Sequence, residues 1–404
     1  CEACHGPGET HVRLNQDPAR RYALQLSGKG DPSIVHPERL TVGRRDEICA
    51  RCHGALVPKK DMWDPVTHRD PFIPGMELTR FNFHFWSEAQ QAKLAADQRE
   101  SALPLKPAPT DGRFWGDGTP LTTALEYNGM ALSKCYLNGQ GDMSCLSCHT
   151  MHPDNPNLML KPGMDGNEAC LQCHSQFRNQ LEEHTRHAPG SPGSLCFNCH
   201  MPHQVFSLMT THRSHRIQVP TIQDSLGTGK PHACNLCHLD KSLGWTRDQL
   251  RKWSPGLGES RPSLSPEEET LPAALLLLTQ GDARTRAVVA GAFMKGAFRQ
   301  TGQHEWAGPL LTAVLEKETY PMVRDVLARA LRSLYGDEIA RGYQPQDLPN
   351  RRDQQLRWLR DRMGSPRLNP GRSGFPLRPD GSLDVSAILK RIESRPDPHV
   401  TINE

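Results

Sequence analysis

Helical periodicity is concentrated in the last third of the chain. Apolar residues recur every three or four positions in the segments 271–279, 285–298, 306–316 and 322–334, which is the spacing that places side chains on one face of a helix. These segments form two similar pairs, so they predict a small all-α domain of HEAT-like helical repeats over residues 271–340. A plain four-helix subdomain fits the same pattern, and both interpretations stay open.

The remainder of the chain has little apolar material for a conventional core. The 404 residues include 34 Pro and 33 Gly, and only 36% are hydrophobic and 6% aromatic, which is lean for domains of this size. A Pro-, Ser- and Glu-rich linker is predicted at 246–270, and 341–404 is predicted to be an extended tail with one short helix at 385–394. No apolar run is long enough for a transmembrane helix. The net charge of +3 gives no reason to expect a nucleic-acid partner.

The chain contains thirteen Cys and nineteen His, and their arrangement indicates a bound cofactor. Twelve of the cysteines fall into six Cys-x-x-Cys-His motifs. Two thiols three positions apart can add to the two vinyl groups of one haem, and the adjoining His can reach the iron. Zinc sites and disulfides use cysteine pairs too, but neither requires a His directly after each pair. We therefore expect six c-type haems, attached through Cys1, Cys4, Cys49, Cys52, Cys145, Cys148, Cys170, Cys173, Cys196, Cys199, Cys234 and Cys237.

The motif histidines are the expected first iron ligands: His5, His53, His149, His174, His200 and His238. An iron with two protein ligands is normally an electron carrier, whereas an iron with one is a potential reaction site. Eleven other histidines lie between residues 11 and 232, so second ligands are plentiful. The predicted ones are His11, His152, His187, His203, His215 and His232. For the sixth place, His36, His84 and His184 compete with His232, while His68 and His212 are weaker candidates.

Two features of the predicted hexahaem domain, residues 1–245, lie outside the Cys-x-x-Cys-His motifs. The long gap between the second and third motifs, residues 54–144, is rich in aromatic residues and is predicted to wrap haem faces and edges; the wall of a substrate pocket is the alternative. Cys135 is the odd cysteine. A buried free thiol is the simpler interpretation, and an intermolecular bond, a further haem link or an unusual iron ligand are the others.

Several segments together resemble bacterial multihaem c-type cytochromes with C-terminal HEAT or tetratricopeptide repeats. They are Cys-Glu-Ala-Cys-His-Gly-Pro-Gly at 1–8, Asp-Pro-Phe-Ile-Pro-Gly at 70–75, Asn-Gly-Met-Ala-Leu-Ser-Lys-Cys-Tyr at 128–136, His-Ala-Pro-Gly at 187–190 and Ala-Cys-Asn-Leu-Cys-His-Leu-Asp at 233–240. The resemblance spans residues 1 to about 340. It implies a mostly irregular and α-helical fold, and it supports His11, His152, His187, His203 and His215 as second iron ligands.

The expected function is electron transfer along mostly bis-His haems, in the periplasm or outside the cell, with redox proteins or further haem-bearing subunits as partners. A polymerised conductive filament is one form of this interpretation. The alternative is a reductase of a small nitrogen or sulfur compound with one open iron. Because haem is attached outside the cytoplasm, the precursor must be exported, although no export signal lies in the printed chain. A lipid on Cys1 is not expected, since haem claims its thiol.

Overall fold

The computed structural model describes residues 1–59, 71–86, 102–104, 112–122, 124–139, 143–152, 159–207, 209–254, 257, 259, 263–300, 304–369, 374–396 and 400. Contacts divide the chain into two units. The first comprises residues 1–107, 124–173 and 215–217, and the second comprises 108–123, 174–214 and 218–404. His68, His399 and Trp63 lie outside the described residues.

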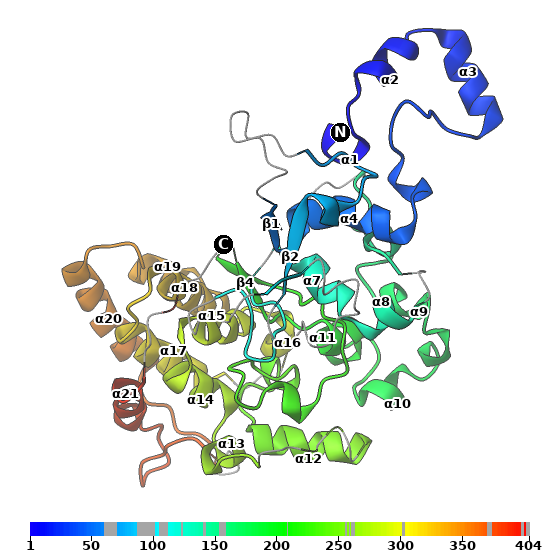
Figure 1. Cartoon of the computed structure of the whole chain (residues 1–404). Coiled ribbons are helices and arrows are strands. Elements are labelled where there is room, and N and C mark those ends of the chain that lie inside the picture. The colour runs from blue at the N-terminus through cyan, green and yellow to red at the C-terminus, as the bar shows by residue number, and fades with distance from the viewer. Residues whose placement is uncertain are drawn as a thin grey trace. The chain divides into compact units, whose positions relative to one another are not determined.

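The first unit consists of short helices and one small sheet (Figure 1). Its helices are α1 (Glu2–His5), α2 (Glu9–Leu14), α3 (Pro18–Ser27), η1 (Pro37–Arg39), α4 (Val42–His53), η3 (Leu78–Arg80), α7 (Glu126–Ala131), α8 (Lys134–Asn138), η4 (Cys145–Ser147) and α9 (Glu168–Leu171). The strands are β1 (Leu56–Pro58), β2 (Asn82–Trp86) and β3 (Ala102–Pro104). β2 is the central strand, antiparallel to β1 and parallel to β3. The predicted wrapping insert therefore supplies all three strands.

A buried side chain joins this sheet to α7. The amide of Asn128 donates from Nδ2 to the carbonyl of Phe85 at 2.9 Å, and its Oδ1 accepts from the backbone N–H of Ala55 at 2.8 Å. Because a buried backbone group needs a partner, this one side chain provides a partner for a group on β2 and for another just before β1. It fixes α7 beside the segment that follows the second motif.

The second unit carries almost all of the conventional hydrophobic core. Its elements are η5 (Ser175–Phe177), α10 (Leu181–Thr185), η6 (Pro192–Ser194), α11 (Cys196–His200), β4 (Val205–Ser207), β5 (Thr210–His212), η7 (Ile222–Asp224), η8 (Cys234–Leu236), α12 (Leu243–Trp253), α13 (Pro266–Thr270), α14 (Ala273–Gln280), α15 (Ala283–Ala292), α16 (Gly296–Arg299), α17 (Ala307–Glu316), α18 (Pro321–Tyr335), α19 (Asp337–Gly342), α20 (Pro349–Met363) and α21 (Val385–Glu393). β4 and β5 form an antiparallel hairpin.

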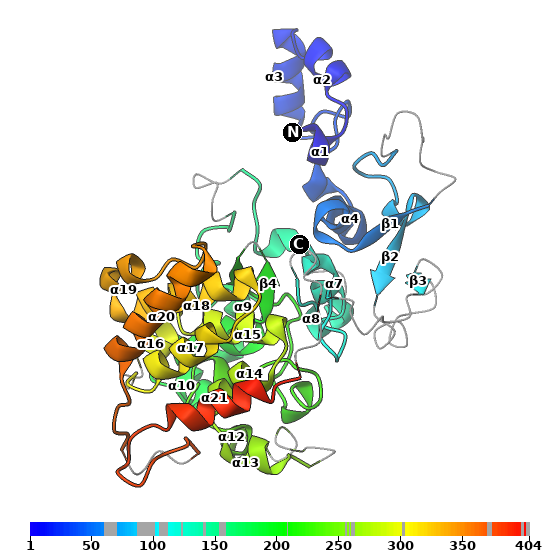
Figure 2. The same cartoon turned by 90° about the vertical axis from the view of Figure 1, so that its left-hand side faces the viewer.

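The predicted helix pairs are present as α14–α15 and α17–α18, and α15 packs against α18 (Figure 2). Their starts follow from local chemistry. The carboxylate of Asp282 caps α15 by accepting from the N–H of Thr285 at 2.9 Å, and Pro321 opens α18. A fully buried, two-bonded ion pair between Arg286 and Glu318, with N–O distances of 2.7 and 2.8 Å, ties α15 to the loop after α17.

Two predictions about the C-terminal part need correction. The tail after residue 340 is not mostly extended, because α19 ends only at Gly342 and the fifteen-residue α20 lies within the tail. Leu356 and Leu359 of α20, together with Ile388 and Ile392 of α21, belong to the same core as the helix pairs. Leu236 and Leu239, beside the sixth motif, are part of that core as well. The contact division therefore does not coincide with the predicted boundary at residue 245, and α12 and α13 occupy much of the predicted linker.

Candidate haem sites

Each Cys-x-x-Cys-His motif begins within or beside a helical turn. The second motif forms the C-terminal end of α4, and α1, η4, α9, α11 and η8 carry the others. In a helical turn, residues three apart lie on the same side, so the two thiols of a motif face one ligand. All thirteen cysteines are free thiols, so the structure supplies no disulfide that would compete with haem attachment.

Four motif histidines each face a histidine from elsewhere in the chain. The ring centres lie 5.9 Å apart for His5 and His152 and 6.2 Å apart for His149 and His215, both pairs in the first unit. In the second unit they lie 6.2 Å apart for His200 and His184, and 6.1 Å apart for His238 and His187. Two imidazoles bound to one metal ion at about 2.0–2.1 Å each would have ring centres about 6 Å apart. Every pair joins one motif histidine to one other, as iron ligation from opposite haem faces requires.

Hydrogen bonds at Nδ1 orient several of these rings. Nδ1–H donates to a backbone carbonyl oxygen in His5 (to Val35, 2.7 Å), His149 (to Met159, 3.1 Å), His200 (to Gln218, 2.9 Å) and His187 (to Thr185, 2.6 Å). A carbonyl only accepts, so the proton is on Nδ1 and the lone pair of Nε2 is available to a metal. His53 is held in the same way by the carboxylate of Glu126, at 3.0 Å.

Two glycines allow the facing histidines to approach. A Cβ on Gly129 would lie 2.8 Å from the backbone nitrogen of Arg216 and 3.0 Å from the carbonyl carbon of His215. A Cβ on Gly193 would lie 2.2 Å from the imidazole of His187. Both positions therefore exclude any side chain, because the segments that carry His215 and His187 occupy that space.

The other predicted second ligands are placed differently. Nδ1–H of His203 donates to the carbonyl of Thr211 at 3.2 Å, and burial lowers the pKa of His203 to about 3, but this ring faces no motif histidine among the described residues. Nδ1 of the fully buried His232 accepts from the N–H of Cys234 at 3.2 Å. That bond places the ring proton on Nε2, the atom that an iron would need. His11 pairs with Asp31 instead of a motif histidine.

Of the weaker candidates among the described residues, one faces a motif histidine and the others do not. His184, an alternative for the sixth place, is the ring that faces His200. Nε2–H of His212 donates to the carbonyl of Ser207 at 3.2 Å and is therefore occupied. His84 is buried on β2, where burial lowers its pKa to about 4, and its ring centre lies 5.3 Å from that of Tyr127. His36 is exposed. Among the described residues, no imidazole faces the motif histidines His53 and His174.

The crevice beside the sixth motif has the composition of a haem pocket. A cavity of about 400 Å³ is lined by Cys234, Cys237 and His238 on one side, by His187 opposite, and by Trp245 and Trp253. The ring of Trp245 lies 5.0 Å from that of His238. Size, aromatic walls and few polar groups are typical of cofactor sites. Both attachment thiols and both candidate ligands converge here, so the residues fit a c-type haem.

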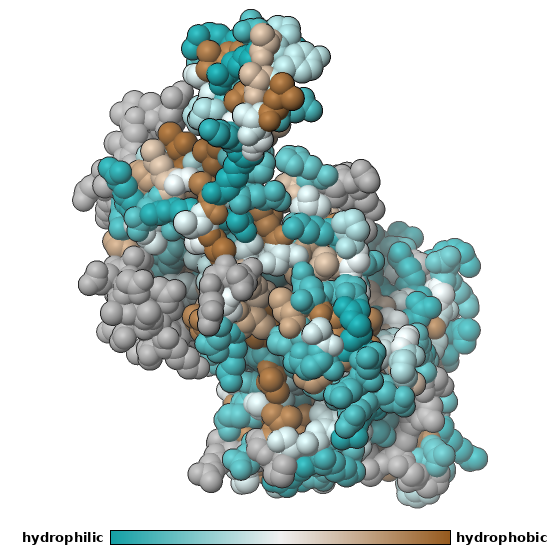
Figure 3. Space-filling view, turned by 90° about the vertical axis from the view of Figure 1, so that its right-hand side faces the viewer, coloured by the Kyte–Doolittle hydropathy of each residue, from teal (hydrophilic) through white to brown (hydrophobic). Residues whose placement is uncertain are grey.

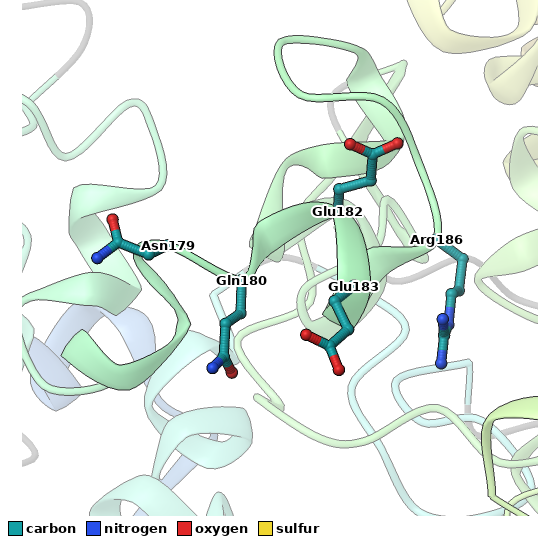
Figure 4. A pocket seen from close by; sticks show the side chains of 5 residues that line it. All are labelled: Asn179, Gln180, Glu182, Glu183 and Arg186. Carbon is teal, nitrogen blue, oxygen red and sulfur yellow. The ribbon is translucent and has the colours of Figure 1, made fainter.

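A larger concavity, of about 610 Å³, differs in chemistry (Figure 4). It is lined by Asn179, Gln180, Glu182, Glu183 and Arg186, and in Figure 4 the side chains of Glu182 and Glu183 point away from each other. No thiol or imidazole lines it. It is therefore an open polar surface on and around α10, not a haem crevice.

Contacts between neighbouring motifs follow their order in the sequence. In the first unit, burial and the proximity of Cys49 raise the pKa of the Cys4 thiol, and an interaction with the thiol of Cys145 lowers the pKa of the Cys49 thiol. Burial and the nearby Cys173 raise the pKa of the Cys148 thiol. In the second unit, burial and then Cys237 raise the pKa of the Cys199 thiol. These shifts show which attachment sites are adjacent.

One family model agrees with this chemistry over a short segment. The family model described as a doubled CXXCH motif matches residues 139–179, which hold the third and fourth motifs. A crystal structure of the outer cell wall cytochrome OcwA aligns with 83% of this chain and 69% of that chain, at 16% sequence identity and a TM-score of 0.36. No curated protein matches. The six motifs are typical of multihaem c-type cytochromes. Within the described residues, no helix has the length and apolar character needed to cross a bilayer.

Replacing Gly193 with alanine tests how His187 is positioned. The added methyl group would occupy the space of the His187 ring, so we expect a Gly193→Ala variant to lose part of the low-spin signal of one haem and to bind carbon monoxide at that haem. Gly296→Ala is the matched control, because nothing lies within 4 Å of the added methyl group. Unchanged spin states in Gly193→Ala would show that His187 is not an iron ligand. Electron paramagnetic resonance and carbon monoxide titration measure both.

Proposed function

We propose that this protein transfers electrons along six covalently attached haems, most of them with two histidine ligands. The observation that carries the proposal is the set of four imidazole pairs at 5.9–6.2 Å, each joining a motif histidine to another histidine. When bound, haem iron supplies one-electron redox chemistry. The facing imidazoles would occupy both axial positions of the iron, which favours electron transfer over reaction with a substrate.

The order of the motifs suggests the path. Contacts among Cys4, Cys49 and Cys145 connect the first three sites, and Cys148 with Cys173 connects the third and fourth. The His174 ring is close enough to affect the pKa of His200, which burial chiefly lowers, and Cys199 lies near Cys237. These neighbours support a single row of sites in sequence order.

Exposure of the motifs suggests where electrons enter and leave. Cys1, Cys52 and Cys173 are exposed, whereas the cysteines of the fifth and sixth motifs are partly covered. Haem edges at the first, second and fourth motifs would therefore be accessible to redox partners. Because haem attachment takes place outside the cytoplasm, the proposed location is periplasmic or extracellular. The C-terminal helix pairs, if they are HEAT repeats, would provide a docking surface.

A reductase with one open iron is the second candidate. It is favoured by His53 and His174, which face no imidazole of the described residues, and by the exposure of both rings. An open iron at either site could bind a small nitrogen or sulfur compound, provided that proton donors converge there.

Spin state and carbon monoxide binding distinguish these functions. For the electron carrier we expect only low-spin ferric signals and no carbon monoxide binding by the reduced protein. A high-spin signal equivalent to one haem, with carbon monoxide binding and turnover of nitrite, hydroxylamine or tetrathionate, would instead establish the reductase. Haem quantification by the pyridine haemochrome method should give six haems per chain, and a smaller number would contradict the proposed row.

A further inference from the structure

The N-terminal arm, residues 9–31, lacks a core of its own. Its helices α2 and α3 contain no buried residue, and in Figures 1 and 2 they project away from α4 and the sheet of the same unit. Val12, Tyr22 and Leu26 are 62%, 67% and 88% exposed, and hydrophobic side chains interrupt the hydrophilic surface at the top of Figure 3. Helices this short are marginal in water without packing, so the arm needs a surface that covers it.

His11 on this arm is prepared to bind a metal. Its Nδ1–H donates to the carboxylate of Asp31 at 3.0 Å. Asp31 is itself held in place by hydrogen bonds from Ser33 and Asn15 and by an ion pair with Arg20 at 2.9 Å. A carboxylate on Nδ1 leaves Nε2 with its lone pair, raises its basicity and fixes the orientation of the ring. Five histidines described above have Nδ1 hydrogen-bonded to an acceptor in the same way: His5, His53, His149, His187 and His200.

His11 lies in the lining of an open concavity. The cavity has a volume of about 460 Å³, and its lining includes Leu24, Arg21 and Arg39 as well as the polar residues Asn15, Gln25 and Asp31. An apolar side chain suits the macrocycle, and guanidinium groups are well matched to haem propionates. Yet no motif histidine of the described residues faces His11.

The same unit contains the complementary half of such a site. The side chain of His53 is 61% exposed, its Nδ1 is fixed by Glu126, and no described imidazole faces it. Among the described residues, His11 is therefore a prepared ligand that faces no motif histidine, and the second attachment site has no facing imidazole. A second copy can satisfy both at once.

We propose that His11 of one copy ligates, through Nε2, the iron of the haem attached at Cys49 and Cys52 of a second copy. The inference rests on the proposed function and names its partner. The arm would cover the exposed second haem, and the haem would cover the apolar side chains of the arm. Because donor and acceptor lie on different surfaces, the contact is heterologous, and repetition would give a closed ring or a filament.

The test combines assembly and spin state in the haem-loaded full chain. Sedimentation velocity and electron paramagnetic resonance are recorded over a dilution series for the wild type, for His11→Ala, and for the control Arg13→Ala, an exposed residue of the same helix. We expect the wild type to assemble and, on dilution, to gain high-spin signal equivalent to one haem together with carbon monoxide binding. His11→Ala should show that signal at every concentration and stay monomeric, while Arg13→Ala should behave like the wild type.

Three outcomes would overturn the inference. A monomeric wild type with low-spin iron at the second site would place the ligand within one chain, and loss of that signal in His68→Ala would identify an internal ligand. A monomeric wild type in which His11→Ala opens an iron would make His11 an internal ligand. Assembly of His11→Ala with unchanged spin states would remove His11 from the interface. Absence of low-spin signals from the other haems would contradict the proposed function instead, so the two failures are distinguishable.

Discussion

A His184→Ala variant is expected to convert one haem from low spin to high spin, whereas His203→Ala should leave every haem low spin. Both histidines belong to the second unit; His184 is exposed and His203 is partly buried. Only His184 lies opposite a motif ring, at 6.2 Å and nearly parallel to His200. Without His184 the iron at the fifth motif would keep one imidazole and gain an open position, which favours the high-spin state and binding of carbon monoxide. The high-spin fraction should correspond to about one haem in the chain.

His203→Ala is the matched comparison, because its ring is also oriented through Nδ1 yet faces no described motif histidine. Adding imidazole to His184→Ala should restore the low-spin signal, which separates loss of a ligand from general unfolding. High-spin iron in His203→Ala but not in His184→Ala would show that His203, and not His184, is an iron ligand. Electron paramagnetic resonance with and without imidazole gives the result directly.

The attachment chemistry is a local property, and for that reason the sequence alone defines it. Two cysteines and a histidine within five residues need only one turn of backbone to act together, and the six motifs each lie in or beside such a turn. The choice of a facing histidine is different. His5 and His152 are brought together by the fold of the whole first unit, and no local pattern specifies that contact.

The position of a histidine relative to the motifs nevertheless predicted some of the facing histidines. His152, His187 and His215 were predicted as second ligands and lie opposite motif rings. His184 was only an alternative, although it lies three residues before His187. For His232, nothing in the sequence indicates the hydrogen bond from the N–H of Cys234 to Nδ1, which places the ring proton on Nε2. The tautomer that a histidine adopts depends on the backbone around it, and only the structure reveals that backbone.

In the fold as well, elements with a strong pattern of their own were predicted, and elements that depend on tertiary packing were not. The helix pairs of residues 271–334 have strong apolar periodicity, and three of the four helices were predicted within two residues of their observed ends. The second was predicted at 285–298, whereas α15 ends at Ala292 and a separate helix, α16, follows. Helix α20 was missed, because its fifteen residues include only Leu356 and Leu359 as buried positions among many Arg, Asp and Gln. It is stabilised by packing on α17, and such tertiary support does not appear in the pattern of the segment itself.

One buried carboxyl lies where two attachment sites meet. Asp46 is fully buried on α4, one turn before Cys49, and its Oδ1 accepts from the backbone N–H of Cys145 at 3.0 Å. Burial raises the pKa of Asp46 to about 6, although the hydrogen bonds from Cys145 and the positive charge of Arg45 oppose this. The hydroxyl of Tyr136 also lies beside the carboxyl. This group therefore changes its charge near neutral pH, between the second and third haem sites.

The midpoint potential of the haems near Asp46 is expected to fall as the pH rises from about 5 to about 7. Below the pKa the carboxyl is neutral; above it the carboxylate repels an added electron and stabilises the ferric form. Reduction at a pH near the pKa would accordingly be accompanied by proton uptake at Asp46. For one electron the slope cannot exceed about 59 mV per pH unit, and partial coupling would give tens of millivolts over the window. Spectroelectrochemical titration at several pH values measures it.

Asp46→Asn should remove this slope and keep the affected potentials near the wild-type values at low pH, because the amide has a similar shape and stays neutral. Glu38→Gln is the control, since it removes an exposed carboxylate of the same unit, whose charge is screened by solvent. A slope that persists in Asp46→Asn would assign the coupling to another acid, such as a haem propionate. A slope lost equally in both variants would indicate a general effect of net charge. Loss in Asp46→Asn alone would couple electron transfer between the second and third sites to one buried proton.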